Sequence, residues 1–161
     1  MTLKTVEVWI DALAAVWDID DGKGGTVRSF RMYEKNEYPA AITPTMAPCA
    51  LSYPTNMDLQ YSQGGPTILL WYGQTDFHLT EDCKPANIPY ILPFYGRIIL
   101  AAAAHMTLGG LVPKGFSILQ NAESAIQFVT YKDAQGHDDH QGIIVKWTVE
   151  QNLSGQVPVL Q

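Results

Sequence analysis

Two stretches in the last third of the chain, AIQFVTY at residues 125–131 and GIIVKWTVE at residues 142–150, alternate their side chains with a period of two. In the second stretch Val145 and Trp147 fall on one face, with polar residues between and beyond them. A period of two is typical of a β-strand, in which successive side chains point to opposite faces. The polar, glycine-containing segment between the two stretches predicts a hairpin loop over residues 133–141.

Upstream of this hairpin, the sequence predicts a helix, two strands and a second helix. Large apolar residues recur at spacings of three and four between residues 4 and 17, which indicates one face of a helix. Apolar, β-rich runs at residues 49–53 and 67–73 predict strands. The second helix is expected over residues 90–107, where an apolar stripe runs up to a glycine pair. Its alanine run at residues 101–104 offers a smooth surface for packing against the sheet or another helix.

This order of elements predicts an α+β fold. We expect an antiparallel-dominated sheet of about four strands, with two main helices packed on one face. A single domain is expected over residues 1–161, with its core at about residues 4–151. Flexible loops are expected at residues 20–38, 55–66 and 133–141, and an exposed C-terminal tail at residues 152–161.

Composition narrows the possible functions. Hydrophobic residues make up 47% of the 161 residues and charged residues only 16%, which is below the roughly 25% of ordinary soluble domains. We therefore expect part of the surface to meet other protein. The net charge of -6, without a run of basic residues, argues against tight binding to a phosphate backbone.

The sequence also indicates in which cellular compartment the protein resides. The longest apolar run, at residues 98–104, is much shorter than the roughly 20 residues that a membrane span needs, and no signal peptide is recognised. We expect a soluble protein with no membrane partner. Cys49 and Cys83 are too few for a zinc site, and two reduced thiols are the favoured interpretation.

One cluster of potential metal ligands occurs in the sequence, His137-Asp138-Asp139-His140. Imidazole and carboxylate groups can bind zinc or another divalent ion, with His137, Asp139 and His140 as the candidate ligands. Four neighbours on a hairpin rarely converge on one ion, however, so an exposed polar turn is the favoured interpretation. We expect no metal site and no cofactor.

No catalytic motif accompanies the other reactive residues. His105 lies in the apolar second helix, but no serine sits in a nucleophile motif, and no cysteine protease signature surrounds Cys49. The glycine clusters at residues 22–25 and 109–110 lack the spacing of a phosphate-binding loop. We therefore expect that the protein is not an enzyme.

Several segments together resemble a known family. They are the amphipathic N-terminal helix, Tyr38-Pro39, the stretch MAPCALSYP at residues 46–54, the helix ending in MTLGGLV at residues 106–112, and the C-terminal hairpin. This arrangement resembles the tail terminator and neck (head-tail joining) proteins of tailed bacteriophages. The resemblance covers roughly residues 4 to 151.

The resemblance implies a structural role in a virion. Six subunits would form a homo-oligomeric ring that caps the tail tube, stops its polymerisation and presents a surface to the head-neck connector. DNA would only pass through the ring, whose bore is expected to be acidic or neutral. The chain would be assembled in the host bacterial cytoplasm and reside in the neck or tail of the virion. Assembly contacts are expected from the loops, at Met57, Leu59, Tyr61, His137 and Asp138.

Three alternatives remain. The chain could be another neck, collar or tail completion protein of a phage. A metal-dependent hydrolase would need His105 and the His137–His140 segment to converge in one pocket. A small-ligand-binding domain would need an apolar cavity of several hundred Å³.

Overall fold

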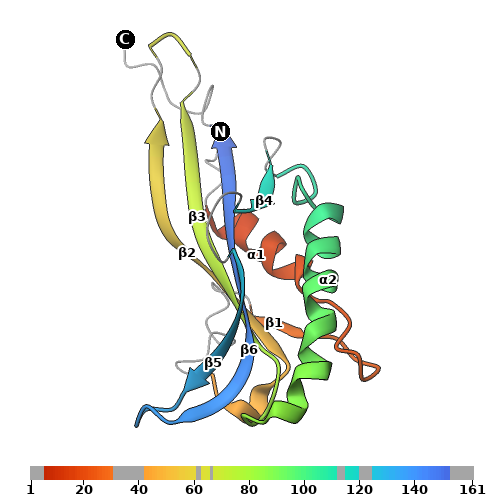
Figure 1. Cartoon of the computed structure of the whole chain (residues 1–161). Helices are drawn as coiled ribbons and strands as arrows, with labels where there is room; N and C mark the ends of the chain where they lie inside the picture. Colours follow the sequence, from red (N-terminus) through yellow and green to blue (C-terminus); the bar gives the residue numbers. More distant parts are fainter. Residues whose placement is uncertain are drawn as a thin grey trace.

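The structure is a computed structural model, and it describes residues 6–30, 42–60, 63–65, 67–111, 115–119 and 125–152. Within these residues the chain forms two helices and six strands (Figure 1). The helices are α1 (Val6–Val16) and α2 (Ile88–Ala104). The strands are β1 (Arg28–Phe30), β2 (Cys49–Gln60), β3 (Ile68–His78), β4 (Phe116–Ile118), β5 (Ile126–Lys132) and β6 (Asp138–Asn152). Short 3-10 turns at Pro44–Met46 and Pro85–Asn87 precede β2 and α2.

The strand β6 organises the sheet. It pairs antiparallel with β3 along one side, from Ile68↔Asn152 to His78↔Gly142. Along its other side it pairs with β5 first and then with the short β4. The strand order is β1-β2-β3-β6-β4, with β5 also on β6, and β1 runs parallel to β2. The last described strand, β6, therefore lies inside the sheet, between β3 on one side and β4 and β5 on the other.

The predicted α+β class with two main helices is confirmed, and four of the five strand pairings are antiparallel, as the prediction of an antiparallel-dominated sheet requires, but the predicted number of strands was wrong. The sheet has six strands instead of about four, and it is mixed because β1 is parallel to β2. Both strands that the sequence did not predict, β1 and β4, contain only three residues each. A period of two cannot be recognised over three residues, because at least four are needed to show the alternation.

The expected loops also differ from the structure. Residues 55–60, expected in the loop 55–66, belong to β2 and pair with β3. Residues 138–141, expected in the loop 133–141, belong to β6. Within the loop 20–38, the strand β1 begins at Arg28, and residues 31–38 lie outside the described residues. Of the expected tail, Asn152 ends β6 and residues 153–161 lie outside the described residues.

Both helices cover the same face of the sheet (Figure 1). Aromatic contacts join α1 to the strands: the ring of Trp9 lies 5.8 Å from that of Trp71 and 5.7 Å from that of Trp147, between centroids. At the end of α1, Trp17 packs edge-on against Phe77 and Phe116. Such tilted and edge-to-face pairs are the favoured arrangement of aromatic rings. They fix α1 across the sheet.

The position of Trp147 depends on the glycine at position 73, which has no side chain. Gly73 lies opposite Trp147 in the register of β3 and β6, and a Cβ at Gly73 would approach Cη2 of Trp147 to 2.1 Å. The indole therefore occupies the space above Gly73. Its Nε1 donates a hydrogen bond to Oγ1 of Thr75 at 3.0 Å, and that hydroxyl lies 2.8 Å from the hydroxyl of Ser52. The buried polar atoms of Trp147, Thr75 and Ser52 thus satisfy one another.

We predict that Gly73→Ala lowers the free energy of unfolding by about 1–3 kcal/mol, because the added methyl overpacks the Trp147 site. Gly96→Ala is the matched control. Nothing lies within 4 Å of a Cβ at Gly96, which is inside α2, so this variant should be more stable by about 0.5–1 kcal/mol. Urea unfolding of both variants measures the two effects. Equal stability of Gly73→Ala and the wild type would contradict the packing described for Trp147.

Candidate functional site

The helix α2 is apolar on both of its faces. Its inner face buries Ile91, Phe94 and Ile98 in the core. Its only charged residue, Arg97, turns toward the loop after α1, where Nη1 donates to the carbonyl oxygen of Asp20 at 3.2 Å. The outer face exposes large apolar side chains over 44% to 71% of their surface: Ile88, Leu92, Ile99 and Leu100, with Met106 just beyond the helix end.

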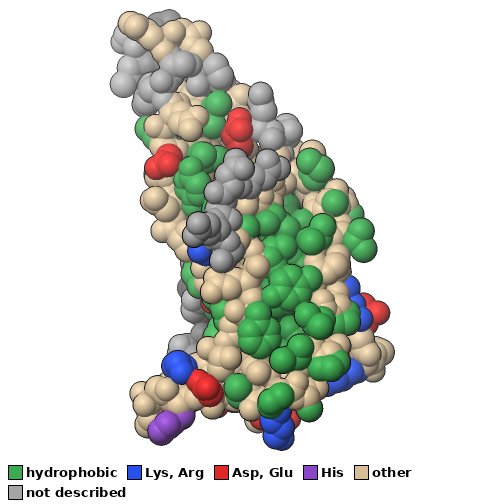
Figure 2. Space-filling model, in the orientation of Figure 1, with side chains coloured by type: hydrophobic (Ala, Val, Ile, Leu, Met, Phe, Trp, Pro, Cys, Tyr) green, Lys and Arg blue, Asp and Glu red, His purple; other side chains and the backbone are tan. Residues whose placement is uncertain are grey.

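An apolar groove lies beside this outer face, between α2 and the strands β4 and β5. Its volume is about 400 Å³. The lining contains no charged side chain: Ile99, Ala102, Ala103, Met106, Phe116, Ser117, Ile118, Leu119 and Ile126. Figure 2 shows hydrophobic side chains gathered over this side of the molecule, with charged ones at its margins. We call this surface the apolar groove.

A second exposed apolar surface lies on a projecting part of the sheet. Beyond the bulge at residues 54–56, β2 and β3 continue as a ribbon that extends past the helices (Figure 1). All six residues 55–60 of β2 are exposed, and among them Met57 and Leu59 expose 45% and 50% of their surface. We call residues 55–60 with the paired residues of β3 the arm. Tyr61, the third contact expected in this segment, lies outside the described residues.

The hairpin between β5 and β6 ends in a polar turn. The carboxylate of Asp133 accepts hydrogen bonds from the backbone N–H groups of Gln135 and His137 at 2.9 and 2.8 Å. Lys132 and Asp138 form an exposed ion pair at 2.6 Å. The side chain of His137 is 78% exposed. These contacts are those of a solvated turn.

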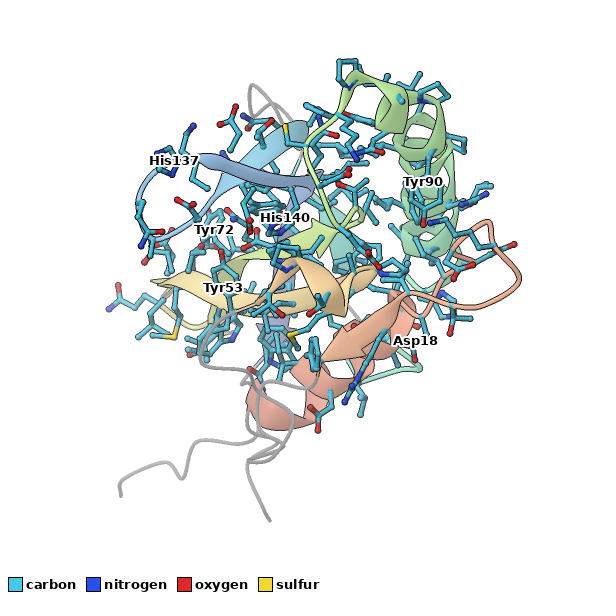
Figure 3. The ribbon with its side chains drawn as sticks, turned by 90° about the horizontal axis from the view of Figure 1, so that it is seen from below. Asp18, Tyr53, Tyr72, Tyr90, His137 and His140 are labelled. Carbon is cyan, nitrogen blue, oxygen red and sulfur yellow. The ribbon has the colours of Figure 1, made fainter. Side chains whose placement is uncertain are left out.

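The structure does not bring the candidate metal ligands together. Figure 3 shows His137 at the outer end of the hairpin and His140 over the sheet, on separate parts of the turn and strand. His137 contacts Asp133, whereas the Nδ1 atom of His140 contacts Asp139 at 2.9 Å. Within the described ranges, no group of three His, Cys, Asp or Glu side chains is placed to hold a metal ion.

His140 belongs instead to a buried pair that the sequence did not predict. Its Nε2 lies 2.6 Å from Nδ1 of His78, on the neighbouring strand β3. The ring of Tyr131 stacks on both imidazoles, with centroids 4.1 Å from His78 and 4.8 Å from His140. If Nδ1 of His140 donates a hydrogen bond to the carboxylate of Asp139, Nε2 of His140 accepts a hydrogen bond from the Nδ1–H of His78. Asp139, His140 and His78 then form one continuous chain of hydrogen bonds.

Burial determines the protonation of His78. Burial and, to a smaller extent, the neighbouring His140 together lower the pKa of His78 from 6.5 to about 3. His78 is thus neutral at physiological pH. Sequence patterns give no sign of this pair, because its members are 62 residues apart and meet only through the register of β3 and β6.

The remaining reactive groups are occupied by structural contacts. Burial raises the pKa of the Cys49 thiol to about 12, so it is protonated and a poor nucleophile. Both Cys49 and Cys83 are free cysteines. The carboxylate of Asp76, whose pKa is raised by burial, accepts hydrogen bonds from Tyr53 and Gln74 at 2.8 and 2.6 Å. His105 caps the C-terminal end of α2, where Nδ1 lies 2.9 Å from the carbonyl oxygen of Ala101.

His105 and the His137–His140 segment do not share a pocket. Figure 1 shows the tip of the β5–β6 hairpin at the bottom of the molecule and the C-terminal end of α2 well above it, on the other side of the sheet. The convergence that a hydrolase using these histidines would need is therefore not met. Among the described helices, none is long and apolar enough to cross a bilayer.

The buried pair makes stability depend on pH in a defined direction. Between pH 6.5 and about 3, the unfolded chain binds a proton at residue 78 that the folded chain does not. The free energy of unfolding therefore falls as the pH decreases through this window, by at most about 1.4 kcal/mol per pH unit from this group. Above pH 6.5 residue 78 is neutral in both the folded and the unfolded chain, so this loss of stability does not occur.

We predict that His78→Gln flattens this dependence. Urea unfolding at pH 7, 6 and 5 should give a smaller loss of stability for the variant than for the wild type. His137→Gln, at an exposed position, should retain the wild-type slope. A His78→Gln variant with the wild-type slope would show that His78 is not held neutral in the fold.

Comparisons with known proteins identify no relative of this chain: no family model matches it, and no curated protein sequence is significantly similar to it.

Proposed function

We propose that this chain is a structural subunit of a tailed bacteriophage, a tail terminator that forms a homo-oligomeric ring. In this role the ring, expected to be a hexamer, caps the tail tube and joins it to the head-neck connector. The protein then acts in the virion, by binding other protein subunits, and DNA only passes through the ring.

The observation that carries this proposal is the apolar character of α2 on both faces. A helix that is hydrophobic all round is normally buried on all sides. Here one side is covered by the core, and the outer side exposes Leu92, Ile99 and Leu100. With Ile88 and Met106, these side chains expose 44% to 71% of their surface on one side of the molecule. A contiguous exposed apolar patch of this kind often marks an interaction site.

The projecting arm supports the same role. The last six residues of β2 are exposed, although a two- or three-stranded ribbon gains little stability without a covered face. A ribbon that extends beyond its own domain can instead contact a neighbouring molecule. Of the contacts expected from the resemblance, Met57 and Leu59 lie on this arm, His137 lies in the exposed hairpin turn, and Asp138 is the exposed first residue of β6.

Charge is compatible with a ring that DNA traverses. The net charge of -6 gives no means of holding a phosphate backbone tightly. Weak binding is what passage requires. Other neck, collar or tail completion proteins share this need for subunit interfaces, and they remain the alternative within the same class.

The proposal is tested with the tail tube protein of the virus that encodes this chain. The chain should co-purify with assembled tubes, electron micrographs should show it at one end of each tube, and its addition during polymerisation should shorten the tubes. Tubes that form normally, with no bound chain and no change in length, would contradict the proposal.

A single charge on α2 should abolish this assembly without unfolding the subunit. We predict that Ile99→Asp reduces binding to tube ends at least tenfold, because the carboxylate would have to be buried in the interface. Its melting temperature should stay close to that of the wild type, because Ile99 is about half exposed in the subunit. Ala134→Asp, in the exposed hairpin turn, is the matched control and should bind normally. Normal binding by Ile99→Asp would show that the outer face of α2 is not an interface.

A further inference from the structure

We infer that the apolar groove of one copy receives the arm of a second copy of this chain. This inference rests on the proposed function in one respect, that copies of the chain assemble with one another. It adds which surface of one copy contacts which surface of the next copy.

The side chains of the arm are sorted by face. Met57 and Leu59 pair with Trp71 and Leu69 of β3, and their side chains lie on the same side of the ribbon because alternate residues share a face. The residue between them, Asp58, points to the opposite side. The arm can therefore insert two large apolar side chains into a partner without burying its carboxylate.

The groove matches this pair in chemistry and size. Because no charged side chain lines it, an inserted apolar segment leaves no charge unpaired. A cavity of about 150 Å³ accommodates a benzene-sized group. The groove, at about 400 Å³, has room for the side chains of both Met57 and Leu59.

The arm cannot fill the groove of its own chain. The arm projects from one end of the sheet, beyond the helices (Figure 1). The groove lies elsewhere, beside the C-terminal half of α2. Each copy therefore has one donor surface and one acceptor surface, and both are unoccupied in a single subunit. A second copy supplies the missing partner for each of them without any further protein.

The apolar surface around the groove extends beyond its lining. On the outer face of α2, Leu92 and Leu100 expose 58% and 71% of their surface beside it, which adds to the contact toward the roughly 800 Å² per partner that a standard interface buries. On the other side of the groove, the half-buried Ile118 and Ile126 add further apolar surface. On the donor side, the exposed residues 55–60 lie on a strand that can follow the length of the groove.

Because donor and acceptor are different surfaces, the contact is head-to-tail. A copy that donates its arm leaves its own groove open for the next copy. Repetition of such a contact gives a closed ring if the rotation between copies closes, and an open filament if it does not. An interface made by two α2 helices related by a two-fold axis would instead stop at a dimer.

Disulfide trapping distinguishes these arrangements. We would prepare Leu59→Cys and Met106→Cys separately in a Cys83→Ser background, with tags of different size, and leave the fully buried Cys49 in place. Both new cysteines replace exposed side chains, so folding should be preserved. Mixing the two proteins under mild oxidation should give a cross-linked heterodimer. As a control, Ala86→Cys, at an exposed position, replaces either partner, and the yield of heterodimer should then be at least tenfold lower.

The outcomes separate the inference from the proposed function. Absence of the heterodimer above control, or a dominant dimer of Met106→Cys with itself, would overturn the arm-in-groove contact. Binding of the uncross-linked chain to tail tubes is measured in parallel. Tube binding without the heterodimer would overturn only the inference, and the heterodimer without tube binding would support the contact while contradicting the role in a phage tail.

Discussion

The packing of α1 across the sheet through tryptophan is the interaction on which the rest of the structure depends. Trp9 contacts Trp71 and Trp147 on neighbouring strands, and the indole of Trp147 fits only because Gly73 has no side chain. This contact sets which face of β3 and β6 is covered. The register of β3 and β6 also determines where β4 and β5 pair and where His78 meets His140. The covered face of the sheet and the buried histidine pair therefore depend on the same alignment of two strands. A one-residue slip would turn every side chain of a strand to the wrong face.

With α1 in place, the sheet has room for a second helix on the same face, and α2 fills it with Ile91, Phe94 and Ile98. What α2 presents outward is not required by this packing. An isolated subunit would be more soluble with polar residues at positions 92, 99 and 100, where the chain has leucine and isoleucine instead. The outer face of α2 and the exposed side chains of Met57 and Leu59 on the arm thus have no packing role within the subunit. Their apolar character is explained if both are covered in an assembly.

Much of this fold could be predicted from the sequence where a segment has one covered face. The strand containing Val145 and Trp147 alternates because one side faces the helices, and both helices show the spacing of a buried stripe. Residues 56–60 alternate polar and apolar side chains, with Met57 and Leu59 on one face, so this segment does show the period of a strand. The loop expected at residues 55–66 was wrong because it rested on the polar composition and the glycines that follow; pairing with β3 determines the conformation. The His78–His140 pair depends on register between distant segments. The apolar groove likewise arises only when α2 lies beside β4, a strand too short to be recognised.

The central claim is that the outer face of α2 is an interface between subunits, and the most direct test is an electron cryomicroscopy reconstruction of the chain assembled with the tail tube that the proposed function assigns to it. The account predicts that Leu92, Ile99 and Leu100 are buried against the neighbouring copy in every subunit of the ring. A ring in which α2 faces solvent, with the subunits joined through other surfaces, would contradict it.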